Sequence, residues 1–132
     1  MNAVLLDTVV VLRALFLPEK LTPRAETTLK DPGIGLHFSP ASLWEIGIKM
    51  SLSGFDGIRL PEDWDKRIPA ALSDLQAGSL TIRAEDCRRV QDLPFHHRDP
   101  FDRMLIAQSL ERGLDIISPD PGFDAYGVRR IW

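Results

Sequence analysis

The stretch Ala3-Val4-Leu5-Leu6-Asp7-Thr8 decides how this chain is expected to fold. The residues from Ala3 to Leu6 form a short apolar run, which predicts a buried strand that ends at Asp7. The segment from Thr8 to Phe16 then carries the pattern of a helix. A buried strand that leads directly into a helix is typical of folds in which strands and helices alternate.

The same alternation continues along the rest of the chain. We expect further helices at 23–29, 40 to about 52, after Pro61, at 84–91 and from Asp99-Pro100 to Gly113, and further strands at 36–38, 80–82, 115–118 and 128–132. Strands that alternate with helices favour a mainly parallel sheet with helices on both faces. The sequence therefore predicts an α/β fold.

Size and composition indicate one globular domain spanning residues 1–132. The chain has 132 residues, of which 44% are hydrophobic, and this is enough to bury a core. No repeat or low-complexity linker divides it. Its single cysteine, Cys87, excludes an internal disulfide and a cysteine zinc cluster.

The start of the chain and its net charge bear on location and on ligands. The opening lacks a basic segment and a small-residue cleavage site, and no run approaches the ~20 apolar residues of a membrane span. We therefore expect a cytoplasmic protein without a membrane anchor.

A net charge of −3 argues against binding nucleic acid by overall charge. It leaves room for a nuclease, because carboxylates that bind a cation are themselves negative.

Two acidic residues follow expected strands at their carboxyl ends. Asp7 ends the first strand, and Asp120 comes after the strand that contains Ile116 and Ile117. In open α/β sheets, ligand sites form at this edge, where the strand order reverses. Glu45 and Asp102 are two further candidates on expected helices.

Carboxylates are hard oxygen ligands that suit Mg²⁺ or Mn²⁺. Acidic side chains that converge in one pocket repel each other unless a cation lies between them. A cation held in this way binds a phosphate oxygen and lowers the pKa of a bound water. This is the chemistry of phosphodiester hydrolysis.

Each acidic residue also has a structural explanation. Asp7 would cap the helix that starts at Thr8, and Glu45 would pair with Lys49 one turn later on a helix surface. Asp99 precedes Pro100, and a residue before a proline at the first helical position is well placed to cap the helix. We therefore interpret Asp99 as a helix cap, with metal binding as a secondary role. Asp102 would suit the helix dipole, and Asp120 would suit a turn before Pro121-Gly122.

The histidines and tryptophans offer two further kinds of candidate site, a zinc site and a base-stacking surface. His96 and His97 are adjacent, neighbouring side chains rarely point the same way, and no third ligand has a suitable spacing, so the sequence does not favour zinc. Tryptophans can stack on bases, but packing is their more common use. We therefore expect Trp44, Trp64 and Trp132 to pack.

Four segments resemble, in the expected order, the four motifs of the PIN-domain family, and in particular of its VapC-type toxins. They are Leu5-Leu6-Asp7-Thr8, the segment from Ser39 to Lys49, the segment from His97 to Gln108, and Ile116-Ile117-Ser118-Pro119-Asp120, which Phe123 to Val128 continues. The third is the most specific. Val9 departs from the pattern, since this position is often His in this branch.

The resemblance implies a PIN-like fold with a central, mainly parallel sheet of about five strands flanked by helices. It implies a metal-dependent endoribonuclease whose Mg²⁺ or Mn²⁺ site consists of Asp7, Glu45, Asp102 and Asp120, with Asp99 close by. Asp102 is preferred to Asp99 as the third acid, because it directly precedes the apolar helix run. By the same analogy Ser118 lies near the site, and Lys49 or Arg103 contacts an RNA phosphate.

The resemblance also implies partners and leaves an alternative. The partners are the RNA substrate, a cognate VapB-type antitoxin that inserts a segment into the acidic cleft, and a second copy in a homodimer. The alternative is a catalytically silent PIN fold that binds only RNA or a partner.

Two other classes fit the residues less well. Haloacid-dehalogenase-like phosphatases need a second Asp where this chain has Val9. Receiver domains need paired acids after the first strand and a late lysine, and no lysine follows Lys66.

Overall fold

The computed structural model describes residues 2–55 and 57–132, and it confirms the α/β prediction. Five strands form one all-parallel sheet in the order β3-β2-β1-β4-β5. The strands are β1 (Ala3–Leu6), β2 (Gly35–Phe38), β3 (Gly78–Ser79), β4 (Asp115–Ile117) and β5 (Arg130–Ile131).

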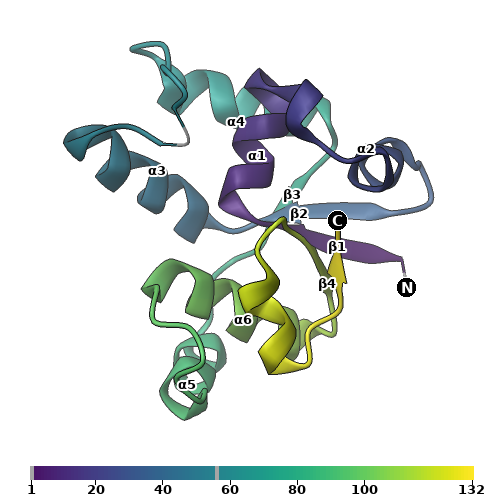
Figure 1. Ribbon diagram of the computed structural model, residues 1–132, viewed down its shortest axis with the longest axis vertical. Coiled ribbons are helices and arrows are strands. Elements are labelled where there is room, and N and C mark those ends of the chain that lie inside the picture. Colours follow the sequence, from purple (N-terminus) through teal and green to yellow (C-terminus); the bar gives the residue numbers. More distant parts are fainter. Residues whose placement is uncertain (1, 56) are drawn as a thin grey trace.

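The helices form a layer on each face of the sheet (Figure 1). One layer contains α1 (Thr8–Phe16), α2 (Pro23–Lys30), α3 (Pro40–Leu52) and α4 (Trp64–Asp74). The other contains α5 (Ala84–Asp92), α6 (Pro100–Arg112) and the 3-10 segment η2 (Pro121–Tyr126). A further 3-10 turn, η1 (Pro18–Lys20), joins α1 to α2.

The central strands show why both faces are covered. In β1, Leu6 packs in the core under α1 and α3, whereas Leu5 packs in the core under α6. In β4, Ile117 packs in the same core as Leu6, and Ile116 packs in the same core as Leu5. All four side chains are fully buried, as expected for central parallel strands whose alternate residues face opposite layers.

Two expected strands differ from those observed. The third strand was predicted at 80–82 and lies at Gly78–Ser79. The prediction was wrong because side chains of α6 take the next carbonyls: Gln108 donates to Leu80 O and Arg112 donates to Thr81 O. The last strand is shorter than the expected 128–132 and comprises only Arg130–Ile131.

The sheet order creates a site-forming edge beside β1. The chain runs outward from β1 to β2 on one side and from β4 to β5 on the other, so the strand order reverses between the paired strands β1 and β4. At the carboxyl end of β1 the Asp7 N–H donates to Ile117 O at 3.0 Å, which keeps β1 and β4 in register. Among the described residues, no helix has both the length and the apolar character needed to cross a membrane.

Candidate active site

Asp7 and Ser118 meet where β1 and β4 end. Asp7 occupies the N-cap position of α1, but its side chain makes no capping hydrogen bond, so the capping interpretation was wrong. Its Oδ2 instead accepts a 2.6 Å hydrogen bond from Ser118 Oγ. The same Ser118 oxygen accepts from the Asp120 N–H at 3.0 Å. One buried hydroxyl therefore links two of the expected site residues.

The surroundings of Asp7 change its acidity. The pKa of this carboxyl is raised to about 6, and the main cause is burial. The Ser118 hydrogen bond lowers the pKa, whereas the charge of Glu45 raises it. A carboxyl of this kind loses its proton more readily when a cation approaches.

Glu45 is brought to Asp7 by a contact between α1 and α3. Thr8 Oγ1 donates to Ser42 Oγ at 2.8 Å, and Glu45 lies one turn further along α3. The Glu45 side chain is 4% exposed, which contradicts the interpretation of Glu45–Lys49 as a surface pair. Its Oε2 contacts Lys49 Nζ at 3.0 Å, whereas its Oε1 is buried without a hydrogen-bond partner in the described part of the chain.

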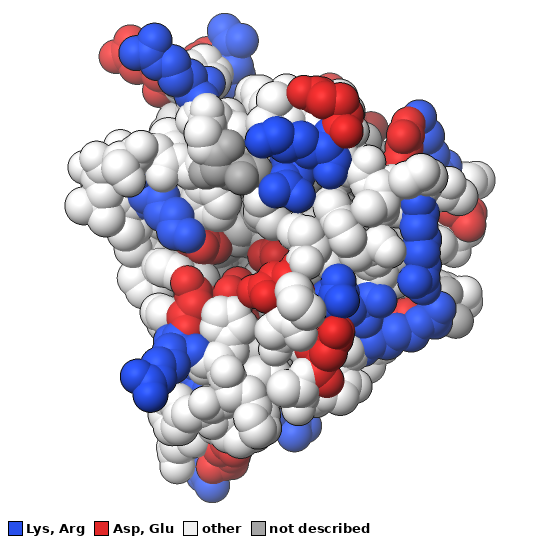
Figure 2. All heavy atoms as spheres, in the orientation of Figure 1, with Lys and Arg blue, Asp and Glu red and all other residues white. Residues whose placement is uncertain are grey.

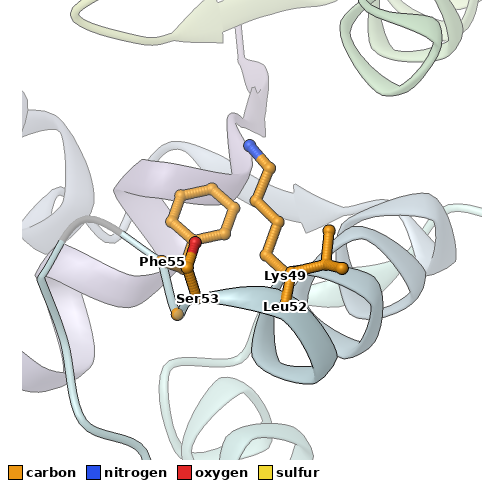
Figure 3. Close-up of a pocket in the computed structure, with 5 residues that line it drawn as sticks. Lys49, Leu52, Ser53 and Phe55 are labelled. Atoms are coloured by element: carbon orange, nitrogen blue, oxygen red, sulfur yellow. The ribbon is translucent and has the colours of Figure 1, made fainter.

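Lys49 forms one wall of a pocket at the end of α3. Its ammonium lies 4.3 Å from the centre of the Phe55 ring, and Figure 3 shows the side chain extending past this ring. Leu52, Ser53 and Gly54 complete the lining. The Lys49 side chain is partly exposed, so its ammonium contacts Glu45 and also faces the solvent.

The beginning of α6 supplies two acids with different roles. Asp99 caps the helix, because its Oδ1 accepts from the N–H groups of Phe101 and Asp102 at 2.9 and 3.0 Å. Asp102 points towards the other acids. Burial raises its pKa to about 8, with further raises from the charges of Asp7, Asp99, Glu45 and Asp120.

His97 lies among these acids, although the sequence did not place it there. Its Nε2 is 3.0 Å from Asp102 Oδ2 and 3.1 Å from Asp120 Oδ2. Ligand atoms of His97, Asp102 and Asp120 lie within 4.8 Å of one another, a proximity that the sequence spacing did not predict. Asp7 and Glu45 stand outside this tighter group. The signal was present in the sequence, because His97 opens the most specific motif.

Arg103 has a different place from the one expected. The residue is 5% exposed, and its guanidinium donates to the carbonyls of Val90, Leu93, Pro94 and His97 at 2.8–3.3 Å. These bonds use its donors within the protein, so the geometry does not support a phosphate contact. The side chain holds the segment that carries His97.

The acids share one surface. Figure 2 shows Asp and Glu atoms gathered in a hollow at the centre of one face, over the space between α3 and α6 in Figure 1, with Lys and Arg atoms around it. The hollow combines two carboxyl groups with raised pKa values, those of Asp7 and Asp102, with the Glu45 oxygen that has no hydrogen-bond partner in the described part of the chain. These are the donor atoms that a hard divalent cation prefers.

Residues 4–128 match the PIN domain, a range that includes β2 to β4, nearly all of β1 and both helix layers. The chain belongs to the PIN domain family. A search of curated proteins finds no match for this PIN domain.

Two solved structures share the fold. One is VapBC2 from Rickettsia felis bound to a DNA fragment from its promoter, with 12% identity and a TM-score of 0.70 over 98% of this chain and 99% of that chain. The other is FitAcB from Neisseria gonorrhoeae, with 15% identity and a TM-score of 0.59 over 96% of this chain and 95% of that chain. At these identities the likeness concerns the fold.

Proposed function

We propose that this PIN domain is a metal-dependent endoribonuclease that hydrolyses RNA phosphodiester bonds through an acidic Mg²⁺ or Mn²⁺ site. One observation carries the proposal. The partly buried Asp102 carboxyl lies among other acids, and its desolvation together with the charges of Asp7, Asp99, Glu45 and Asp120 raises its pKa to about 8. Such mutual repulsion costs folding free energy, and a bound dication would relieve it.

The side chains present fit a hard dication. Asp7, Asp102 and Asp120 would hold it, directly or through water, with Glu45 and Asp99 beside them. When bound, the cation would stabilise charge on a phosphate oxygen and lower the pKa of a water. The chemistry of the donor set, which is carboxylate oxygen almost throughout, suits Mg²⁺ and Mn²⁺.

Glu45 is suited to act on the attacking water. Lys49 Nζ lies 3.0 Å from its Oε2, so that oxygen is already engaged in an ion pair. The buried Oε1 has no partner among residues 2–55 and 57–132 and is free to accept a proton. We assign Glu45 Oε1 as the atom that orients or deprotonates the water. Lys49 remains a proposed neighbour of the RNA, whereas Ser118 is fully buried and acts in this proposal through its hydrogen bond to Asp7.

We further propose that the protein is the toxin of a VapBC-type toxin–antitoxin system in the cytoplasm. The support is the fold shared with VapBC2 and FitAcB over nearly the whole chain. A VapB-type antitoxin would then be the cognate partner, and a homodimer is expected. An antitoxin segment with a cationic side chain would complement the acidic hollow.

The test is cleavage of a structured RNA by purified protein with Mg²⁺, with Mn²⁺ and with EDTA. Asp7→Asn and Asp102→Asn should remove activity while the protein stays folded. The matched control is Asp65→Asn, which changes an exposed acid on α4. Cleavage that persists in both site variants would contradict the assigned site. No cleavage of several RNAs by the wild type would favour the silent RNA- or partner-binding alternative.

A further inference from the structure

His97 touches two of the proposed cation ligands, yet the proposed function gives it no task. Its Nε2 lies 3.0 Å from Asp102 Oδ2 and 3.1 Å from Asp120 Oδ2. Asp102 comes from α6, whereas Asp120 comes from the turn after β4. The ring therefore joins carboxylates that belong to two separate elements.

The hydrogen bond on the other ring nitrogen decides which tautomer is present. The Asp99 N–H donates to His97 Nδ1 at 3.2 Å. A nitrogen that accepts a hydrogen bond carries a lone pair, so in the neutral ring the proton is on Nε2. His97 thus faces Asp102 and Asp120 with an N–H donor. This argues against His97 as a metal ligand, since a ligand nitrogen needs its lone pair.

The protein holds this ring in position from several sides. The His97 backbone N–H donates to the Tyr126 hydroxyl at 2.7 Å, and its carbonyl accepts from Arg103 at 3.3 Å. The ring fills space that Gly122 leaves open. A Cβ at Gly122 would lie 2.9 Å from His97 Cδ2 and 3.3 Å from Nε2. Any larger residue at Gly122 would therefore displace the ring.

We propose that His97 is a positioning residue of the cation site. Its Nε2–H holds the Asp102 and Asp120 carboxylates towards each other, so that a dication meets two oriented ligands. Hydrogen bonds from neighbouring groups commonly orient metal-binding carboxylates, and their loss weakens metal affinity about 10–100-fold. Gly122 provides the space that this arrangement needs. The inference rests on the proposed function, because it assumes that these carboxylates bind a dication.

The test is calorimetric titration of the purified chain with Mn²⁺ alone, beside thermal unfolding of each metal-free variant. His97→Ala and Gly122→Ala should weaken Mn²⁺ binding about 10-fold or more. His97→Gln keeps an N–H donor at a similar reach and should restore most of the affinity. His96→Ala is the matched control, since this exposed neighbour stacks edge-on against Tyr126 and touches neither acid.

The outcomes separate the inference from the proposed function. Wild-type affinity in folded His97→Ala would overturn the inference and leave the proposed function standing. Tighter Mn²⁺ binding by His97→Ala would also overturn it, since the ring would then compete with the cation. Equal weakening in His97→Ala and His97→Gln would overturn the donor role. Failure of the wild type to bind Mn²⁺ would overturn the proposed function and this inference together.

Discussion

Ser118 Oγ donates a 2.6 Å hydrogen bond to Asp7 Oδ2, joining the ends of β1 and β4. This bond lowers the pKa of Asp7, but burial outweighs it, and the pKa is raised to about 6 with the bond in place. Ser118→Ala should therefore raise that pKa further and shift the acidic limb of the cleavage pH profile upwards. Ser118→Thr keeps the hydroxyl and should leave the profile in place. Identical profiles for wild type and Ser118→Ala would show that the bond has no part in tuning Asp7.

The raised pKa of Asp102 predicts how stability depends on pH in the metal-free chain. Its value of about 8 lies above the ordinary 3.8, so between these pH values the folded state binds more protons than the unfolded chain. The free energy of unfolding should then fall as pH rises from about 4 to 8. In EDTA, we expect a higher melting temperature at about pH 5 than at about pH 8.

Asp102→Asn is the variant that isolates this effect. It removes the titrating carboxyl, so the metal-free melting temperature should rise near pH 8 and its decline with pH should become shallower. Mn²⁺ should stabilise the wild type at pH 8 more than it stabilises the variant. An equally steep decline in Asp102→Asn would assign the pH dependence to other groups.

The sequence predicted the regular parts of this molecule well, for a physical reason. In β1 and α1 the apolar pattern and the tertiary packing agree, and the helix has the predicted bounds Thr8–Phe16. The third strand was misplaced because the α6 side chains of Gln108 and Arg112, far away in sequence, take the carbonyls of the predicted residues. No local pattern reveals such a contact.

The candidate site shows the same contrast between residues that local patterns predict and residues whose contacts depend on the tertiary fold. Asp7 and Asp120 were placed by the rule that parallel strands present their carboxyl ends at one edge. His97 was missed because its contact with Asp120 depends on the fold of η2 and on the space at Gly122. The expected phosphate contact of Arg103 is not supported by the structure, because the sequence does not reveal that this cationic side chain is buried.

Lys49 allows a direct test of RNA contact. Its ammonium is partly exposed beside Glu45, at the edge of the acidic hollow. Lys49→Glu should weaken RNA binding and raise KM, because it places a negative charge near the phosphate backbone. The matched control is Lys30→Glu, which changes an exposed lysine in a similar i,i+4 pair with Glu26 on α2. Equal RNA affinity in both variants would remove Lys49 from the interface.

Arg103 should contribute to the stability of the fold and make no contact with RNA phosphates. Arg103→Lys cannot keep bonds to four carbonyls, so we expect a loss of at least about 2 kcal/mol in the free energy of unfolding. The segment before α6 would loosen, and Mn²⁺ affinity should fall with it. The salt dependence of RNA binding should stay unchanged. A shallower salt dependence, by about one phosphate contact, would restore Arg103 to the RNA interface.

The buried ion pair between Asp86 and Arg112 should stabilise the layer of α5 and α6 without affecting the site. Asp86 is fully buried, and both of its oxygens accept from Arg112, at 2.6 and 2.9 Å. The pair joins α5 to the end of α6 opposite Asp102. Arg112→Leu strands a buried carboxylate, so urea unfolding should show a loss of about 3–5 kcal/mol.

A second substitution distinguishes the lost attraction from the stranded charge. Adding Asp86→Leu to Arg112→Leu removes that charge, so the double variant should be more stable than Arg112→Leu alone. Mn²⁺ affinity should match the wild type in both proteins wherever they are folded, because the pair lies away from the acidic hollow. A double variant less stable than the single one would mean that Asp86 stabilises α5 mainly through the 2.8 Å hydrogen bond from the Arg83 N–H.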